Sequence, residues 1–174
     1  PLRILIFGGS LGSKSFNQLL PSIFKKINGK NKLSIIHQSG EKMFELLKES
    51  YEGADFKVEI RKYIFDMEKK YNWADIVIAR SGALTVSELI TSGTASILIP
   101  YPFAVDDHQF FNAKILKDAG AAEIIREKDL EEKLVVNLAK LNRKKCENMA
   151  LKAKGLQRYD ACAEVRKVCN TLLK

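Results

Sequence analysis

The sequence is built from short apolar runs that alternate with amphipathic stretches, and this alternation constrains the fold more than any other feature. Six runs have the length and composition of buried β-strands, at residues 3–7, 33–37, 56–60, 75–79, 95–99 and 121–125. Apolar residues at helical spacing predict helices near residues 15–28, 41–51, 66–72, 84–92, 107–119, 129–141, 143–156 and 160–173. Strands that alternate with helices form βαβ units, in which helices cover both faces of a parallel sheet. We therefore predict an α/β fold with a doubly wound parallel sheet.

Clusters of Gly, Ser and Pro follow several of these strands and indicate where a ligand would bind. They lie at residues 8–13, 39–40, 81–82 and 100–102. In a doubly wound sheet, ligands bind outside the carboxyl ends of the strands. Because no repeat interrupts the pattern, we predict one domain over residues 1–155, followed by a basic helix over 156–174. Pro21 falls inside the first predicted helix, where it either kinks the helix or marks a late start.

The composition is that of an ordinary globular protein. Hydrophobic residues make up 46% and charged residues 29%, and the longest apolar runs are too short to span a bilayer. The three cysteines, Cys146, Cys162 and Cys169, lack C-x-x-C spacing, which favours reduced thiols in a cytosolic protein over a disulfide, metal or redox site. No signal-peptide pattern is present at the N-terminus. Because the chain begins at Pro1 without Met, we expect a piece of a longer protein.

Positive charge is concentrated near the C-terminus. Residues 140–174 hold ten of the 29 Lys and Arg residues but three of the 21 Asp and Glu residues. Such a segment could face an anionic membrane, a phosphate-bearing substrate or nucleic acid, although the solvated face of a Lys-rich helix is the commoner explanation. Nucleic acid is not expected, because Tyr159 is the segment's one aromatic residue and single-strand binders interleave several.

The first candidate site is the sequence Gly-Gly-Ser-Leu-Gly-Ser at residues 8–13, between a strand and a helix. Glycines let backbone N–H groups approach an anion, and the following helix N-terminus favours negative charge. Ser10 adds a hydroxyl donor. The pattern is neither G-x-G-x-x-G nor a P-loop. A simple tight turn remains the alternative.

The second candidate is Arg-Ser-Gly-Ala-Leu-Thr-Val-Ser-Glu at residues 80–88. Amide groups at 83–85 would face a phosphate at the start of the helix. Glu88, about one turn further on, could accept hydrogen bonds from a vicinal diol such as ribose. Thr85 and Glu88 also have the spacing of a capping box, in which each side chain would bond to the backbone of the helix start. The spacing does not separate these two interpretations.

The third candidate is Asp-Asp-His-Gln-Phe-Phe-Asn at residues 106–112, which follows the proline-containing loop 100–103. Polar side chains at such a helix start suit recognition of sugar hydroxyls, although Asp106 and Asp107 could simply be helix-start residues. His108 alone is more typical of a surface histidine than of a catalyst. The sequence has no Asp-x-Asp motif to hold Mg²⁺.

Together with His-Gln-Ser-Gly at 37–40 and Tyr-Ile-Phe-Asp-Met at 63–67, these segments resemble the MurG family of bacterial glycosyltransferases. The resemblance runs over essentially the whole chain, and residues 81–88 are its most specific part. It covers only the C-terminal half of the family's enzyme. The resemblance implies a two-domain GT-B glycosyltransferase, with a Rossmann-like UDP-sugar-binding domain at 1–155. It also implies that the basic helix at 156–174 packs toward the absent N-terminal half.

The same resemblance implies a role for each matching residue. Ser10 would contact the donor diphosphate, Ile64 would hold uracil through its backbone, and Glu88 would take the ribose hydroxyls. The helix start at 83–85 would bind phosphate and sugar, and Gln109, with His108 beside it, would read the hydroxyls of N-acetylglucosamine. The full predicted substrate-binding set is Ser10, Leu11, Gly12, Ile64, Ala83, Leu84, Thr85, Val86, Ser87, Glu88, His108, Gln109 and Asn112. No cofactor or metal is implied, and the general base is expected in the N-terminal half.

The implied reaction is an inverting transfer of N-acetylglucosamine from UDP-N-acetylglucosamine to the 4-hydroxyl of undecaprenyl-diphospho-N-acetylmuramoyl-pentapeptide, which converts lipid I to lipid II. The implied location is the cytoplasmic face of the bacterial inner membrane, with lipid I and the anionic surface as partners and the present chain soluble. Three alternatives share the fold. They are the donor subunit of a split lipid-linked transferase, a UDP-N-acetylglucosamine 2-epimerase and a non-catalytic nucleotide-sugar-binding module.

Overall fold

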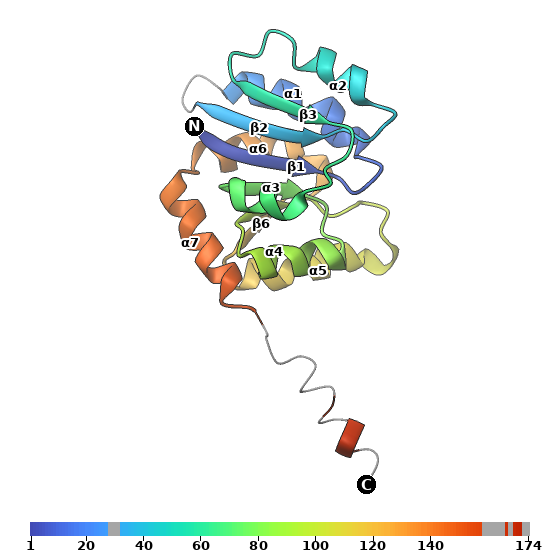
Figure 1. Cartoon of the computed structure of the whole chain (residues 1–174), viewed down its shortest axis with the longest axis vertical. Helices are drawn as coiled ribbons and strands as arrows, with labels where there is room; N and C mark the ends of the chain where they lie inside the picture. The colour runs from blue at the N-terminus through green and yellow to red at the C-terminus, as the bar shows by residue number, and fades with distance from the viewer. Residues whose placement is uncertain (28–31, 158–165, 167–168, 172–174) are drawn as a thin grey trace.

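The sheet predicted from the apolar runs forms the centre of the molecule. The computed structural model describes residues 1–27, 32–157, 166 and 169–171. Six parallel strands have the order β3-β2-β1-β4-β5-β6 (Figure 1). They are β1 (Leu2–Phe7), β2 (Leu33–Gln38), β3 (Lys57–Arg61), β4 (Ile76–Ala79), β5 (Ser96–Leu98) and β6 (Ala122–Ile124). Every predicted strand is present to within one residue at each end, so the predicted fold class is confirmed.

The strand order reverses between β1 and β4, the place where a doubly wound sheet has its crevice. From β1 the chain builds outward through β2 and β3, and it then returns to the other side of β1 to build β4, β5 and β6. Such a reversal is the topological switch point at which doubly wound sheets bind ligands. Phe7 is in register with Gln38 on one side and with Ala79 on the other. The loops that follow these three residues therefore start at the same edge of the sheet.

Seven helices surround the sheet in the part of the chain that the structure describes. They are α1 (Lys14–Ile27), α2 (Phe44–Ser50), α3 (Met67–Trp73), α4 (Ala83–Ser92), α5 (His108–Asp118), α6 (Leu130–Ala139) and α7 (Arg143–Lys154). Short 3₁₀ turns precede α5 and α6 at Val105–Asp107 and Glu127–Asp129. These seven confirm the predicted helices, whereas most of the one predicted at 160–173, and with it most of the basic segment 156–174, lies outside the described residues.

The two faces of the sheet bury separate apolar cores. Ile4 and Ile6 of β1 pack with α1, α2 and α6, whereas Leu5 and Phe7 pack with α3, α4 and α5 on the opposite face. This follows from the strand period of two, because a central parallel strand must be apolar on both faces. Helix α7 contributes to both cores, through Met149 on one side and Ala153 on the other. It therefore crosses the end of the sheet, as Figure 1 shows.

Helix α1 continues through Pro21, which resolves one of the alternatives left by the sequence. The helix starts at Lys14, so the proline does not mark a late start. Pro21 is buried on the inner side of the helix. Of the helices in the described ranges, none combines the length and apolar character needed to cross a membrane.

Candidate functional site

The loops after β1, β4 and β5 meet at the switch point, and Arg80 links all three. Its guanidinium donates to the hydroxyls of Ser13 and Ser15, at 3.1 and 2.9 Å, and pairs with the carboxylate of Glu127. It also donates to the carbonyls of residues 99–100 at the end of β5. A planar fork of five donors suits such a multiple contact, which a lysine could not reproduce. Arg80 begins the second candidate segment, but its sequence pattern predicted no role for it.

The glycine loop after β1 makes a close backbone contact with the loop after β2. A Cβ atom on Gly12 would lie 2.0 Å from the carbonyl oxygen of Ser39, and one on Gly40 would lie 2.0 Å from the carbonyl oxygen of Leu11. Gly12 has φ +77° and donates its amide to the carbonyl of Gly9 at 3.0 Å. The tight-turn interpretation therefore accounts for Gly12. Ser10 and Leu11 lie at the exposed tip of the loop, next to the switch point.

Gln38 at the end of β2 connects this loop to the one after β3. Its side-chain amide donates to the carbonyl of Gly9 at 2.9 Å, and its side-chain oxygen accepts from the backbone amide of Ile64 at 2.8 Å. The side chain of Ile64 is buried. The amide of Ile64 is therefore occupied inside the protein, and the carbonyl is the backbone group that remains at this position to interact with a ligand, as an acceptor.

The capping-box interpretation of Thr85 and Glu88 is wrong. Helix α4 starts at Ala83 after Gly82, so Thr85 already lies inside the first turn, and no described side chain caps this end. Glu88 instead accepts a hydrogen bond from the hydroxyl of Tyr71 on α3, at 2.9 Å. Burial, together with this bond to Glu88, raises the pKa of Tyr71, so its hydroxyl keeps its proton at neutral pH.

The first turn of α4 presents amide groups to the crevice. The first intrahelical acceptor, the carbonyl of Gly82, takes the amide of Val86, so the amides of residues 83–85 point out of the helix end. The side chain of Leu84 is 73% exposed beside them, whereas that of Val86 is buried in the core. Of the predicted substrate-binding residues in this turn, Val86 is not available to a ligand, because its side chain and its amide are both occupied inside the protein. Ser87 is exposed one turn along the helix.

Glu88 lines a groove of about 510 Å³ between α3 and α4. The groove is mixed in character, with apolar, hydroxyl, amide and carboxylate side chains. Its lining residues are Met67, Glu68, Tyr71, Asn72, Leu84, Ser87, Glu88, Thr91 and Ser92. A carboxylate on the wall of such a groove can accept hydrogen bonds from ligand hydroxyls.

The start of α5 is bonded to the turn after β4. The hydroxyl of Ser81 donates to the carbonyl of Gln109 at 2.7 Å, and the side-chain amide of Asn112 donates to the carbonyl of Ser81 at 3.1 Å. The side-chain oxygen of Gln109 accepts the backbone amide of Tyr101 at 3.0 Å, which orients the rest of that amide. His108 is exposed and contacts the carbonyl of Val105 through Nδ1 at 2.8 Å.

Asp107 does not act as a simple helix-start residue. It has φ +53° and no side-chain capping bond, and its two carboxylate oxygens accept from the guanidinium of Arg126 at 2.7 and 2.6 Å. The hydrogen bond from Arg126 holds the pKa of Asp107 below its usual range. The guanidinium also lies 4.1 Å from the ring centroid of Phe110. This pair fixes the loop from which α5 starts.

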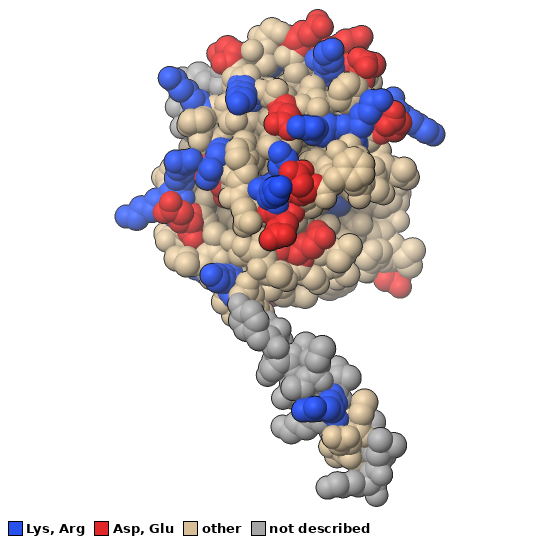
Figure 2. Space-filling view, in the orientation of Figure 1, with Lys and Arg blue, Asp and Glu red and all other residues tan. Residues whose placement is uncertain are grey.

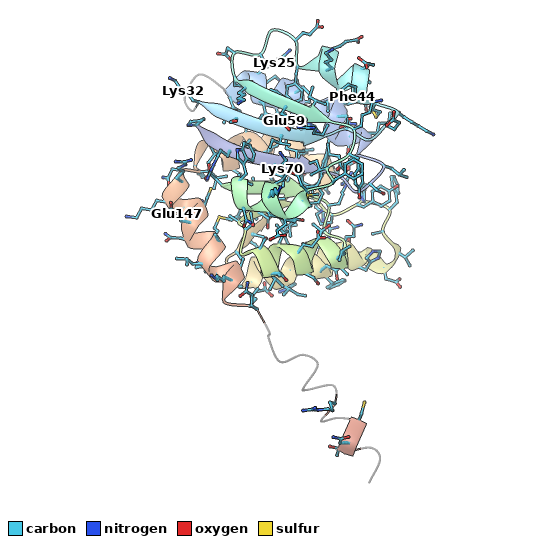
Figure 3. All side chains as sticks on the ribbon, in the orientation of Figure 1. Lys25, Lys32, Phe44, Glu59, Lys70 and Glu147 are labelled. Carbon is cyan, nitrogen blue, oxygen red and sulfur yellow. The ribbon has the colours of Figure 1, made fainter. Side chains whose placement is uncertain are left out.

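Positive and negative side chains are mixed on the face of the molecule that Figure 2 draws. Figure 2 shows Lys and Arg interspersed with Asp and Glu, with basic side chains over α7. Glu147 lies among them, as Figure 3 shows. Within the described ranges, no three His, Cys, Asp or Glu side chains form a group that could hold a metal ion.

The fold and these open groups at the switch point define a Rossmann-like α/β domain. Residues 3–165 match the family model described as the glycosyltransferase family 28 C-terminal domain. The chain belongs to this family, and the sequence-based identification as a glycosyltransferase domain is confirmed.

Two relatives carry the name UDP-N-acetylglucosamine--N-acetylmuramyl-(pentapeptide) pyrophosphoryl-undecaprenol N-acetylglucosamine transferase. The one from Shewanella amazonensis is 41% identical over 178 residues, with 99% of this chain and 49% of the relative covered. The one from Dechloromonas aromatica is 39% identical over 173 residues, with the same coverage. The chain therefore spans about half the length of the curated relatives it matches.

Solved structures agree with this assignment. The crystal structure of Acinetobacter baumannii MurG superposes with a TM-score of 0.87 at 38% identity, over 98% of this chain and 50% of that one. The MurG resemblance seen in the sequence is thereby confirmed. Glycosyltransferase VinC in complex with dTDP gives a TM-score of 0.64 at 17% identity, over 98% of this chain and 42% of that one, and shows a shared fold.

Proposed function

We propose that this chain is the donor-binding half of an inverting glycosyltransferase. The enzyme moves N-acetylglucosamine from UDP-N-acetylglucosamine to the 4-hydroxyl of undecaprenyl-diphospho-N-acetylmuramoyl-pentapeptide, the lipid I to lipid II step of peptidoglycan synthesis. The names of relatives about 40% identical to the chain support the choice of reaction. The structural observation that carries the proposal is the bond from the hydroxyl of Ser81 to the carbonyl of Gln109, which brings the start of α5 next to the start of α4, the helix that also carries Glu88.

The diphosphate of the donor binds at the first turn of α4. The outward-pointing amides of residues 83–85 and the positive end of the helix dipole both favour an anion there. Ser10, exposed at the tip of the neighbouring glycine loop, donates its hydroxyl to the same group. The side chains of Leu11 and Leu84 are exposed and would be available to pack against the bound donor.

The nucleoside occupies the groove between α3 and α4. Glu88 accepts the ribose hydroxyls, and the carbonyl of Ile64 accepts the N3–H group of uracil, while the amide of Ile64 stays bonded to Gln38. Adenine presents an acceptor, N1, at the corresponding edge. A carbonyl facing that acceptor would be repulsive, so the site favours uridine over adenosine.

The sugar binds against the start of α5. The side-chain oxygen of Gln109 is held by the amide of Tyr101, and its N–H groups are therefore oriented as donors to hydroxyls of N-acetylglucosamine. His108 lies beside Gln109 on the exposed side. Asn112 acts one turn further along through its bond to Ser81, which fixes the distance between α4 and α5.

This half lowers the barrier through the leaving group. As the bond from C1 to the diphosphate breaks, negative charge grows on the phosphate oxygens. Oriented amides at a helix N-terminus stabilise that charge without reorganisation, and fixed binding of the sugar holds C1 in line for attack. The general base belongs to the N-terminal half, so the present chain binds donor but does not transfer sugar by itself.

The acceptor is a membrane lipid, so the enzyme works at the cytoplasmic face of the inner membrane. Residues 1–155 form the donor domain. Helix α7 carries Lys144 and Lys152, which are exposed, and Lys145, which is half-buried. These side chains attract the anionic leaflet that presents lipid I.

Calorimetric titration of the 174-residue chain with UDP, UDP-N-acetylglucosamine and ADP tests the donor site. We expect uridine-selective binding that Glu88→Ala weakens by about 1–3 kcal/mol, the cost of losing hydrogen bonds to a charged group. Glu68→Ala is the matched control, because it removes another carboxylate from the same groove. Equal binding of UDP and ADP, or a Glu88→Ala variant indistinguishable from wild type, would contradict the proposal.

A further inference from the structure

Tyr71 stands out because the donor site described above does not use it, yet it touches Glu88. It is 5% exposed, and its ring meets the ring of Phe7 on β1 edge to face, with centroids 6.1 Å apart and an interplanar angle of 81°. Its hydroxyl reaches the wall of the groove and donates to Oε2 of Glu88 at 2.9 Å. A buried ring thus ends in one polar group aimed at a partly exposed carboxylate.

The helix that carries Tyr71 is anchored on both sides of this residue. The ammonium group of Lys70 lies 3.7 Å from a carboxylate oxygen of Glu59 on β3, and Figure 3 labels both residues. Met67 and Trp73 pack against the apolar core below α3. The phenol of Tyr71 therefore has little freedom to move.

Glu88 gains a defined orientation from this contact. A glutamate on an open helix face has three side-chain torsions and samples several rotamers. Since Tyr71 retains its proton, it acts as a donor and occupies one oxygen of the carboxylate. The other oxygen, Oε1, then remains to accept a hydrogen bond from a ligand in the groove that Glu88 lines.

We propose that Tyr71 is a positioning residue that holds Glu88 ready for the ribose hydroxyls of the nucleotide. This inference rests on the proposed function, because it presumes that Glu88 binds ribose. It adds that the selectivity for a ribose diol depends on a residue that itself need not touch the ligand. The contribution of Tyr71 to affinity should therefore exist only for ligands that carry the hydroxyls.

Tyr71→Phe, which removes the hydroxyl and keeps the ring, tests this in the 174-residue chain. UDP and 2′,3′-dideoxy-UDP are titrated into wild type and variant. We expect about a fivefold to tenfold loss of affinity for UDP, the size of one lost hydrogen bond, and no change for the dideoxy compound. Glu88→Ala should lower UDP affinity further, and adding Tyr71→Phe to it should then have no effect.

Tyr51→Phe is the matched control, because Tyr51 is equally buried and also loses one hydroxyl hydrogen bond, to His37 on the opposite face. It should change thermal stability but not the ratio of the two affinities. If Tyr71→Phe weakens both ligands equally, or neither, Tyr71 has only a structural role and the inference is overturned while the ribose assignment of Glu88 stands. If Glu88→Ala leaves UDP binding unchanged, or the wild-type chain does not bind UDP, the proposed function fails and the inference fails with it.

Discussion

His37 should make the stability of this domain depend on pH. The residue lies in β2 and is completely buried, with Nδ1 3.1 Å from the hydroxyl of Tyr51. Its other ring nitrogen, Nε2, has no hydrogen-bond partner among the described residues. Burial disfavours the charged imidazolium and lowers the pKa of His37 from 6.5 to about 3. The folded protein therefore keeps His37 neutral where an unfolded chain would protonate it.

The size and sign of the effect follow from this difference. Below pH 6.5 the unfolded chain binds a proton at His37 that the folded chain does not, so the free energy of unfolding falls as the pH falls. With a folded pKa of about 3, the loss relative to pH 8 is about 2 kcal/mol at pH 5, at about 1.4 kcal/mol per pH unit. For a domain stable by roughly 5–15 kcal/mol, this is a measurable fraction.

Urea unfolding at pH 8, 6 and 5 would measure it in wild type, His37→Asn and His108→Asn. Carboxylates titrate in all three proteins, so the useful quantity is the difference in pH dependence between them. We expect His37→Asn to lose about 2 kcal/mol less than wild type between pH 8 and pH 5, and His108→Asn, at an exposed position, to behave like wild type. Identical pH dependence in His37→Asn and wild type would show that the buried imidazole is not the cause.

Three further predictions concern the frame of the site and its charge. Gly12→Ala should lower the free energy of unfolding in urea by at least about 3 kcal/mol, and the control Gly53→Ala by about 1–2 kcal/mol. Both glycines have positive φ, but of the two only Gly12 has a backbone atom within reach of the added methyl group. Equal losses in the two variants would show that close backbone approach is not the reason for a glycine at position 12. Arg80→Lys should cost about 2–3 kcal/mol by the same assay, since the fork of hydrogen bonds is lost around a largely buried charge. Arg61→Lys, which alters an exposed pair, should cost at most about 0.5, and a similar loss in both would contradict the linking role of Arg80. Replacing three lysines of α7 by Glu should weaken sedimentation with anionic vesicles but not with neutral ones; the three are Lys144, Lys145 and Lys152. Unchanged binding to anionic vesicles would show that these lysines only form a solvated face.

The central part of the sheet was predictable because strands β1, β4 and β5 are buried on both faces and are therefore nearly continuous apolar runs. Residues 76–79 and 96–98 are buried throughout, and no amphipathic helix produces that pattern. The positions of the loops at the carboxyl edge then followed from the alternation of strands and helices. The sequence did not reveal which polar groups are already occupied inside the protein, because that depends on contacts between distant segments.

Glu88 shows why the sequence could not reveal which partner a polar side chain has in the folded protein. A capping box requires Thr85 to precede the helix, and the structure starts the helix two residues earlier, at Ala83. The spacing of the two residues is identical in both cases, so only the boundary distinguishes them, and boundaries are the least certain part of a pattern-based prediction. The actual partner of Glu88 is Tyr71, 17 residues earlier on another helix. No local pattern connects the two.

The polar residues of the site form two groups, one that holds the loops together and one that faces the proposed ligand. The first group donates hydrogen bonds to the backbone and side chains of neighbouring loops and so fixes the distances between the strand ends. It consists of Gln38, Arg80, Ser81 and Asn112. Groups at the first turn of α4, together with Glu88, face the crevice and the groove. Because the first group holds the second in place before a ligand arrives, little ordering cost remains for binding, and the affinity of each ligand contact is retained. The fixed geometry also means that charge developing on a departing diphosphate would meet donors that are already oriented, which is the condition under which such donors accelerate a reaction most.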